Sequence, residues 1–521
     1  MNANRKGFRV NAKLKQKFEK RKRQLERRID KSNWDGKSPM LTPPSIHFEM
    51  SEKHQGIAAG GIGMIAELTK RLDLREEINS TIPLLKLHLP YDEADHVFNI
   101  AFNLLAGGTC LDHIEHRRND EAFLDALGAQ RIPDPTTAGD FCRRFDAADI
   151  LLLHEAFNNV RQRVWKQQPK EFLEQAVIEA DGTMVETTGQ CKEGIGMNYK
   201  KQWGYHPLVL TLANTGELLY VANRSGNRPS HEKSPFYFNQ AVKLCREAGF
   251  KKVLLRGDTD FSLTGQFDAW SNDNVQFVFG MDAMPNLVEI AKNLDESRWS
   301  PLVRPQKDRK GQPRRRPENH KQAFVDSKGY QTKRLLGECY AEFEYQPNAC
   351  SRKYRMVVVY KDIEVRASQQ WLFDEPKYFF YVTNVPKSEM SARQVIANAN
   401  QRCDQENTIS QLKQAGILAA PLDTLNSNGA YMSIASLAWS LKCWSALMLP
   451  ESGRPAQKAK RKREKRRVLR MDFSTYLNTL IMIPVMIVKR ARQLVYRFLT
   501  WTPHLELLFH LHEAARKPLR C

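Results

Sequence analysis

From Ala176 to Phe279 the chain alternates short apolar runs with turn signals, in an order that few folds accommodate. Short apolar runs bounded by polar residues are typical of buried strands. The pattern predicts three strands, a helix and two further strands, at residues 176–178, 208–212, 218–221, 236–250, 253–255 and 275–279. This order indicates an open α/β sheet in which the first and fourth strands can be neighbours.

Carboxylates follow the first and the fourth of these strands. Asp181 stands before Gly182, and Asp258 lies in the run RGDTDF together with Asp260. If the two strands are adjacent, Asp181 and Asp258 meet at neighbouring strand ends, where they repel unless a cation lies between them. Mg²⁺ suits such a pair because it takes oxygen ligands. Two alternatives stay open: Asp181 only caps a turn, and Asp260, which shares a strand face with Asp258, is the second ligand.

A third candidate carboxylate lies on the helix predicted over residues 392–418. At about 100° per residue, Arg402, Glu406 and Lys413 fall within roughly 40° of one helix face. A surface ladder of salt bridges would produce the same pattern.

The charge of the chain indicates a polyanionic partner. It has 521 residues, 41% of them hydrophobic, and a formal net charge of +21. Three basic segments contribute: residues 1–32, 307–321 and 458–470. Such segments hold nucleic-acid phosphates in many proteins, although a solvated tail has the same composition.

Other segments predict the surrounding organisation. Residues 57–170 are typical of helices, and one of them carries Arg143 and Arg144. That helix is a candidate for DNA recognition or an ordinary amphipathic helix with a basic face. An apolar helix is predicted over 430–449, and a final helical stretch over 473–499 with a kink at Pro484.

Composition also argues against several classes of protein. No run of 18 uncharged apolar residues predicts a membrane span, and no apolar region follows the first charges as in a secretory signal. The nine cysteines include no C-x-x-C pair, which argues against a zinc ribbon or a disulfide framework. A reduced cytoplasmic setting is expected.

The three carboxylates together resemble those of the DDE transposases of bacterial insertion sequences. The similarity is to the group with a β-rich insertion before the glutamate helix and an R-x3-E-x6-K signature, which Arg402, Glu406 and Lys413 match. Asp181 and Asp258 match the two catalytic aspartates. The family usually has a tyrosine three residues before the arginine, where this chain has Ala399.

The resemblance implies an α/β fold with an RNase H-like mixed-sheet core, interrupted by a β-rich insertion and flanked by helical N-terminal and C-terminal regions. It implies a basic arm and linker (1–45), a helical DNA-binding domain (46–170), a core in two parts (171–282 and 373–450), the insertion (283–372) and a basic, helical C-terminal region (451–521).

The resemblance further implies a transposase that binds terminal inverted repeats, cleaves DNA at the element ends and joins the 3′-OH to target DNA. Asp181, Asp258 and Glu406 would be catalytic and hold Mg²⁺, with Mn²⁺ able to substitute. Arg402 and Lys413 would contact DNA, as would Arg143 and Arg144. The expected partner is double-stranded DNA in the bacterial nucleoid, bound by a homodimer on paired ends. A nuclease without strand transfer and a non-catalytic DNA-binding protein are the alternatives, and an RNA-binding protein is the weakest.

Overall fold

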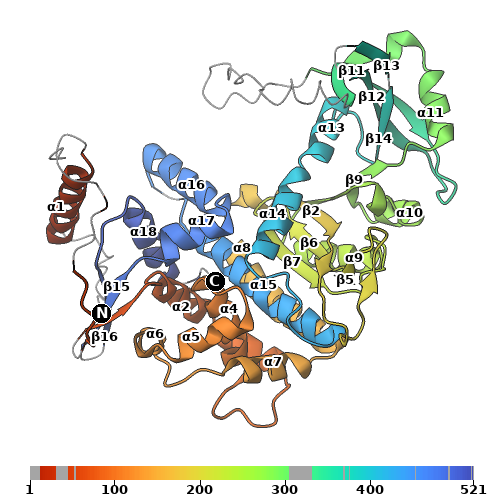
Figure 1. Ribbon diagram of the computed structural model, residues 1–521. Helices are drawn as coiled ribbons and strands as arrows, with labels where there is room; N and C mark the ends of the chain where they lie inside the picture. The colour runs from red at the N-terminus through yellow and green to blue at the C-terminus, as the bar shows by residue number, and fades with distance from the viewer. Residues whose placement is uncertain are drawn as a thin grey trace, which may run out of the picture. The chain divides into compact units, whose positions relative to one another are not determined.

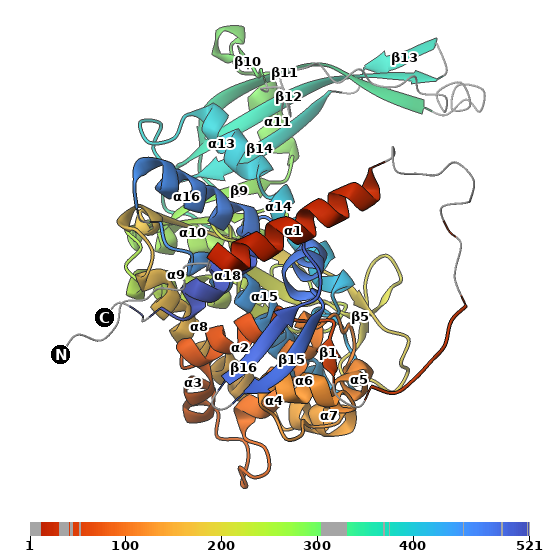
Figure 2. The ribbon, with the colours of Figure 1, turned by 90° about the vertical axis from the view of Figure 1, so that its left-hand side faces the viewer.

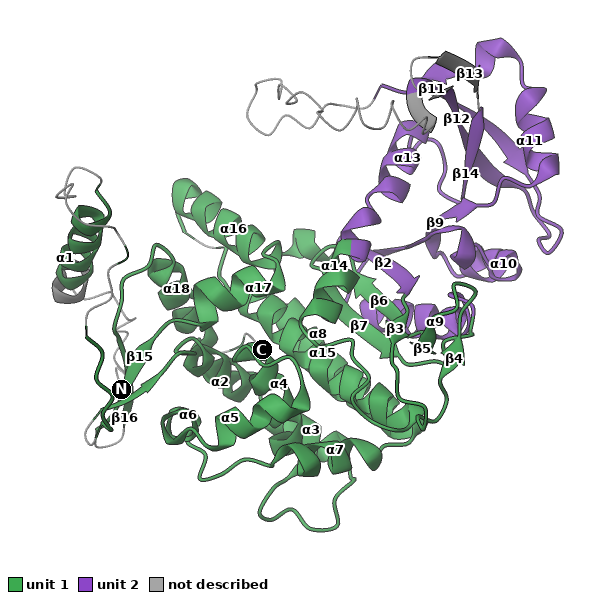
Figure 3. Ribbon diagram, in the orientation of Figure 1, with its two compact units in different colours: residues 1–173, 183–228, 407–521 green, residues 174–182, 229–406 purple. Residues whose placement is uncertain are grey.

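The computed structural model describes residues 12–30, 41, 45–51, 54–303, 331–367, 370–374, 376–451, 453–490, 493–517 and 519. The basic loop predicted at 307–321 and part of the basic arm lie outside the described residues. The chain forms two compact units (Figures 1 and 3). Unit 1 comprises 1–173, 183–228 and 407–521, and unit 2 comprises 174–182 and 229–406.

Unit 2 is built on a mixed sheet with a parallel part. Strands β2 (Gln175–Gly182), β8 (Lys252–Gly257) and β9 (Gln276–Met281) run parallel in the order β9-β8-β2. Helices α9 (Ser234–Glu247) and α10 (Thr264–Asn272) form the two crossovers. The predicted adjacency of the first and fourth strands is therefore confirmed.

The insertion extends this sheet. β14 (Lys377–Thr383), which follows the predicted insertion, pairs antiparallel with β9. The insertion strands β12 (Tyr354–Ala367), β11 (Gln331–Tyr345) and β10 (Ser300–Pro301) continue outward from β14. A short strand, β13 (Gln370–Asp374), also pairs with β12. The insertion also contains α11 (Pro285–Lys292). It is β-rich, as predicted, and it is continuous with the core sheet.

Helices cover both faces of the sheet because side chains alternate along its strands. On β9, Phe277 and Phe279 pack against rings from α9 and α10, including Phe238 and Phe267. Val278 belongs to a second cluster, on the other face, with residues of β12 and of α13 (Ala392–Asn400). The resulting layers make the α/β core that the resemblance implied.

The single helix predicted over 392–418 is wrong: α13 ends at Asn400, and α14 begins at Cys403 and runs to Gln414. The break has both a local cause and a contact from a distant part of the chain. The side-chain amides of Asn398 and Asn400 donate to backbone carbonyls four residues earlier, at 3.0 and 2.7 Å. The guanidinium of Arg256 donates to the Asn398 carbonyl at 2.8 Å. That carbonyl oxygen, which would accept a hydrogen bond in a continuing helix, therefore already has a side-chain partner. Arg402 therefore lies in the junction.

Unit 1 contains the helices expected before residue 170: α2 (Ile62–Arg71), α3 (Leu74–Thr81), α4 (Glu93–Leu105), α5 (Ile114–Arg118), α6 (Glu121–Leu127), α7 (Pro135–Arg143) and α8 (Ala147–Lys166). The predicted apolar helix is α15 (Leu425–Leu447), and the second basic segment forms α16 (Pro455–Leu469). The N-terminal basic arm includes α1 (Ala12–Ile29).

A predicted hairpin is also confirmed in unit 1, where β6 (Leu208–Leu212) pairs with β7 (Glu217–Ala222). Its Glu217 is fully buried and accepts hydrogen bonds from Trp165 and Trp444 at 2.9 Å. Arg161 lies 3.3 Å from the same carboxylate. These contacts tie the hairpin to α8 and α15. A smaller sheet, β3 (Val185–Glu186), β5 (Trp203–Tyr205) and β4 (Gly196–Met197), precedes it.

The helix predicted over 473–499 is wrong. After α17 (Phe473–Tyr476) and one π-turn, β15 (Val485–Arg490) and β16 (Gln493–Phe498) form a hairpin beside β1 (Gln55–Ile57), before α18 (Leu505–Ala515) (Figure 2). Pro484 ends the helical turn. Val485 and Ile487 are buried and alternate with less buried neighbours, a strand pattern that β-branched residues favour.

Of the helices in the described ranges, none has the length and apolar character needed to cross a membrane.

Candidate active site

Asp181 and Asp258 lie at the carboxyl ends of two neighbouring parallel strands of unit 2. The register of β2 and β8 pairs Glu179 with Arg256, and each aspartate follows two residues later. Asp181 is the penultimate residue of β2, and Asp258 follows the last residue of β8. The strand order thus brings together the two carboxylates that the sequence predicted.

Burial disfavours the charged form of both aspartates. Burial raises the pKa of Asp181 to about 7; Arg402 lowers it, and the charges of Asp258 and Glu406 raise it. Burial also raises the pKa of Asp258, an effect that Arg402 partly offsets. An added positive charge stabilises the charged form of such groups. The strand ends are therefore suited to a cation.

Arg402 already supplies one positive charge. Its Nη1 lies 2.8 Å from Oδ2 of Asp258, and its Nη2 lies 3.5 Å from Oε1 of Glu406. Its side chain is 19% exposed, whereas Glu406, on α14, is 57% exposed. The helix junction places Arg402 between the strand end and the glutamate.

A cavity of about 410 Å³ opens beside these groups. Asp258, Arg402 and Glu406 line it, together with Ala399 and a stretch of β14 that includes Tyr378 and Tyr381. Asp260 is exposed, and its backbone N–H donates to Oδ1 of Asp258 at 3.0 Å. The structure thus places Asp258, and not Asp260, at the cavity wall.

A buried pair that sequence analysis missed supports the site. Nε of Arg256 donates to Oε1 of Glu179 at 2.6 Å, and Nη1 donates to the Asn398 carbonyl and, at 3.3 Å, to Oε1 of Gln401. Burial raises the pKa of Glu179, and Arg256 opposes that rise. Arg256 therefore links both strands to the junction that carries Arg402.

A signal for this pair is present in the sequence. Glu179 and Arg256 stand two residues before Asp181 and Asp258, respectively, with opposite charges at equal offsets. Residues two apart on a strand share a face. Opposite charges on neighbouring strands are expected to pair once the strands are known to be parallel and adjacent.

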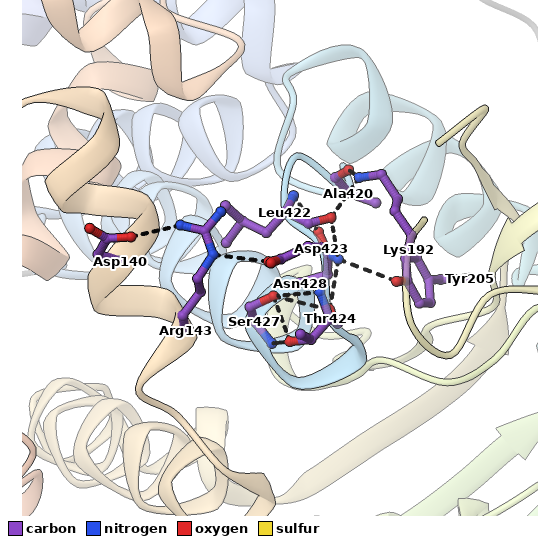
Figure 4. Close-up of polar contacts among 10 residues, drawn as sticks. All are labelled: Asp140, Arg143, Lys192, Tyr205, Ala420, Leu422, Asp423, Thr424, Ser427 and Asn428. Carbon is purple, nitrogen blue, oxygen red and sulfur yellow. Dashed lines mark hydrogen bonds and ion pairs between the residues drawn. The ribbon is translucent and has the colours of Figure 1, made fainter. Parts of the chain in front are cut away.

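The other predicted DNA contacts lie in unit 1. Arg143, at the end of α7, lies 2.8 Å from Oδ1 of Asp140 and 3.0 Å from Oδ1 of Asp423 (Figure 4). Arg144 caps α7 and is exposed. Lys413 is exposed on the part of α14 that belongs to unit 1.

Neighbouring residues in Figure 4 hydrogen-bond to the loop before α15. Lys192 donates to the carbonyls of Ala420 and Leu422, the latter at 2.6 Å. Asn428 donates to the Leu422 and Thr424 carbonyls at 3.0 and 2.8 Å. Arg143 thus contacts a well-anchored loop through Asp423.

Within the described part of the chain, no group of three or more His, Cys, Asp or Glu side chains is placed to hold a metal ion. The donors at the strand ends nevertheless fit a divalent cation, because carboxylate oxygens are its preferred ligands. Burial raises the pKa of Asp181 and of Asp258 even though Arg402 opposes the rise, so a further positive charge would stabilise both carboxylates.

The sequence matches the family described as "Transposase DDE domain group 1" over residues 55–517. The chain belongs to the DDE transposases. No curated protein matches it. A solved piggyBac transposase synaptic complex with hairpin DNA is similar over 82% of this chain and 84% of its own, with 10% identity and a TM-score of 0.33. The family match alone carries the identification.

Membership of this family establishes the chain as a transposase of the DDE class, a class that acts on DNA by cleavage and transfer. The fold class predicted from the sequence is confirmed, since unit 2 has the parallel strands, crossover helices and interrupting β-rich insertion of an RNase H-like core.

Proposed function

We propose that this transposase binds the terminal inverted repeats of its element, cleaves DNA at the element ends and joins the freed 3′-OH to target DNA. The observation that carries the proposal is the meeting of Asp181 and Asp258 at adjacent strand ends, with Arg402 linking Asp258 to Glu406. Phosphodiester transfer needs negative oxygen donors beside a cationic group that holds phosphate.

Asp181, Asp258 and Glu406 would hold the divalent metal, which we propose is Mg²⁺, with Mn²⁺ able to substitute. When bound, the metal would activate the attacking oxygen and stabilise the leaving one. The unfavourable burial of the aspartate charges supports this assignment, because a cation offsets it.

The remaining residues bind and orient DNA in this proposal. Arg402 lines the cavity and would contact the phosphate beside the scissile bond, since a guanidinium binds two phosphate oxygens at once. Lys413 would contact phosphate further along the strand, and Arg143 and Arg144 would contact the duplex. Arg256 is a positioning residue, because it fixes the junction from which Arg402 projects.

The protein would act on double-stranded DNA in the nucleoid, as a homodimer on paired ends. The net charge of +21 supports the binding of a polyanion. A dimer would bring the two element ends together for coordinated cleavage and joining.

A strand-transfer reaction tests the proposal. Purified protein is incubated with Mg²⁺, a labelled duplex taken from the DNA that flanks the gene, and a supercoiled target plasmid. We expect nicks at the element end and label joined to the plasmid, both absent with Asp181→Asn. Cleavage without joined product would support the nuclease instead, and end binding with neither product would support a non-catalytic protein.

A further inference from the structure

A short segment of unit 1 exposes large apolar side chains in alternation. Ile46, Phe48 and Met50 are 68%, 89% and 93% exposed, and the intervening residues are His47 and Glu49. In Figure 2 this segment, in red, carries no helix or strand. Alternation with period two is the pattern of a strand with one buried face, and such exposure marks a contact surface. From here on, "the arm" means residues 45–50 only, and not the basic N-terminal segment that contains α1.

The same unit offers a matching groove. A cavity of about 1020 Å³ runs beside β16. Its lining combines apolar side chains, including Phe98, Phe102, Leu494, Phe498 and Leu508, with charged ones, including Glu67, Arg75 and Arg516. Among the described strands, β16 pairs with β15 alone, so its outer edge is open for main-chain hydrogen bonds. An extended peptide can therefore add to this edge as a strand and place alternate side chains in the groove.

We infer that the arm of one copy docks along β16 of a second copy, so that two reciprocal arms hold the dimer. Ile46, Phe48 and Met50 would lie on the groove side. Glu49 would lie on the opposite side of the added strand, the side of Arg497, so the polar faces are complementary in charge. The inference rests on the proposed dimer and specifies its interface.

Chain connectivity favours a second copy over the same chain. The arm leads into β1, which lies at the opposite edge of the three-stranded sheet from β16. A strand placed outside β16 is about 14 Å from β1, at roughly 4.8 Å per strand spacing. Five residue steps separate Met50 from Gln55 and span at most about 17 Å. The arm of the same chain could reach β16 only if this linker were almost fully extended around the sheet.

The buried area is sufficient for a stable dimer. Three large apolar side chains cover on the order of 400 Å² on each arm and a similar area of groove. Two reciprocal arms would therefore bury about 1,600 Å², the size of a standard specific interface.

The test measures the mass of the full-length protein in solution without DNA, by light scattering after size exclusion. We expect a dimer that persists at high salt, because apolar contacts are not screened. Phe48→Asp in the arm and Leu494→Asp in the groove should each weaken the dimer by about 100-fold or more, since each would bury an unpaired charge. Leu87→Asp is the matched control for Phe48→Asp, because Leu87 is 80% and Phe48 89% exposed, and it should stay dimeric.

Mixing the two variants tests whether the groove is occupied by the arm of a second copy. The arm of the Leu494→Asp chain and the groove of the Phe48→Asp chain are both intact, so a mixture should recover dimers through one contact. A monomeric wild type, variants as dimeric as the control, or a mixture that stays monomeric would overturn the inference. Because the readout is mass, it is independent of whether the protein cleaves or joins DNA.

A second measurement avoids altered stability. A photo-reactive phenylalanine analogue replaces Phe48, and isotopically heavy and light copies are mixed before irradiation. Crosslinks to residues 493–498 should join heavy with light chains. Crosslinks confined to chains of one isotope, or to other residues, would overturn the proposed exchange of arms.

Discussion

Arg402 in unit 2 and Arg143 in unit 1 each lie between two carboxylates, but the pKa of one partner, Asp258, is raised, whereas the pKa of the other arginine's partner, Asp423, is lowered. Arg143 is 41% exposed and bridges Asp140 and Asp423, which are more exposed still. Burial raises the pKa of Asp423, but hydrogen bonding from Arg143 and the backbone brings it below its ordinary value. Arg143 and the backbone thus stabilise the charged form of Asp423.

Arg402 is more buried, and its partner Asp258 keeps a raised pKa despite the contact. Asp181 lies in the same field, with a pKa raised to about 7. One guanidinium therefore does not satisfy the carboxylates at the strand ends. The ion pairs alone do not separate the two arginines; the raised pKa of Asp258, beside Arg402, is what marks the strand ends as a candidate catalytic site.

The largest expected effect is at the strand ends. Asp181→Asn and Asp258→Asn should each reduce end cleavage by at least about 1,000-fold, because loss of a metal ligand removes several kcal/mol of transition-state stabilisation. End affinity, measured by gel shift, should change by less than about threefold. Asp260→Asn is the control and should cleave at a near-normal rate. If Asp260→Asn is inactive and Asp258→Asn is active, Asp260 is the second metal ligand instead of Asp258.

The buried pair behind the site should matter next. Arg256→Met leaves the Glu179 carboxylate buried and unpaired, which typically costs about 3–5 kcal/mol of unfolding free energy. Denaturant unfolding measures this loss. The double variant Glu179→Gln/Arg256→Met should recover part of the stability but not the cleavage rate, because the junction loses its tether. Full recovery of cleavage would show that Arg256 is only structural.

Arg402→Ala and Arg143→Ala compare the two arginines directly. Arg402→Ala should lower cleavage by about 100-fold, on the scale of one lost phosphate contact in the transition state. Arg143→Ala should cost no more than about 1 kcal/mol of stability, as for exposed ion pairs, and lower end affinity by less than about tenfold. Equal effects of the two substitutions on cleavage would contradict the proposal that only Arg402 acts at the catalytic site.

Lys413→Ala should have the smallest effect of this series. A lysine that contacts phosphate acts on binding, so end affinity should fall a few-fold and recover at low salt, with the slope of log affinity against log salt smaller by about 1. Glu406→Ala, on the same helix, should instead leave affinity intact and remove cleavage. A Lys413→Ala variant with an unchanged salt slope would argue against a phosphate contact.

Much of unit 2 could be predicted because its signals are local. The apolar runs of β2, β8 and β9 and the carboxylates after the first two of them are readable one strand at a time. The helix break before Arg402 was not predictable in this way. It depends on Arg256, which lies more than 140 residues earlier in the chain and reaches the Asn398 carbonyl only after folding.

The C-terminal hairpin shows a second limit. An apolar stretch around Pro484 is compatible with a kinked helix or with a strand, and the choice is settled by pairing with β1, more than 400 residues away. Non-local pairing overrides local propensity in such cases. The six-part domain division stays a prediction. So do the roles of the candidate site residues Asp181, Asp258, Glu406, Arg402, Lys413, Arg143 and Arg144.

Exchange of one carboxylate tests whether the strand ends hold the catalytic metal. Asp181→Cys replaces an oxygen donor with a thiolate, which Mg²⁺ binds poorly and Mn²⁺ tolerates better. End cleavage is measured in each metal, with Asp260→Cys as the control. We expect Asp181→Cys to be inactive with Mg²⁺ and to regain cleavage with Mn²⁺, while the control cuts with both. Wild-type cleavage by Asp181→Cys in Mg²⁺ would contradict the metal assignment.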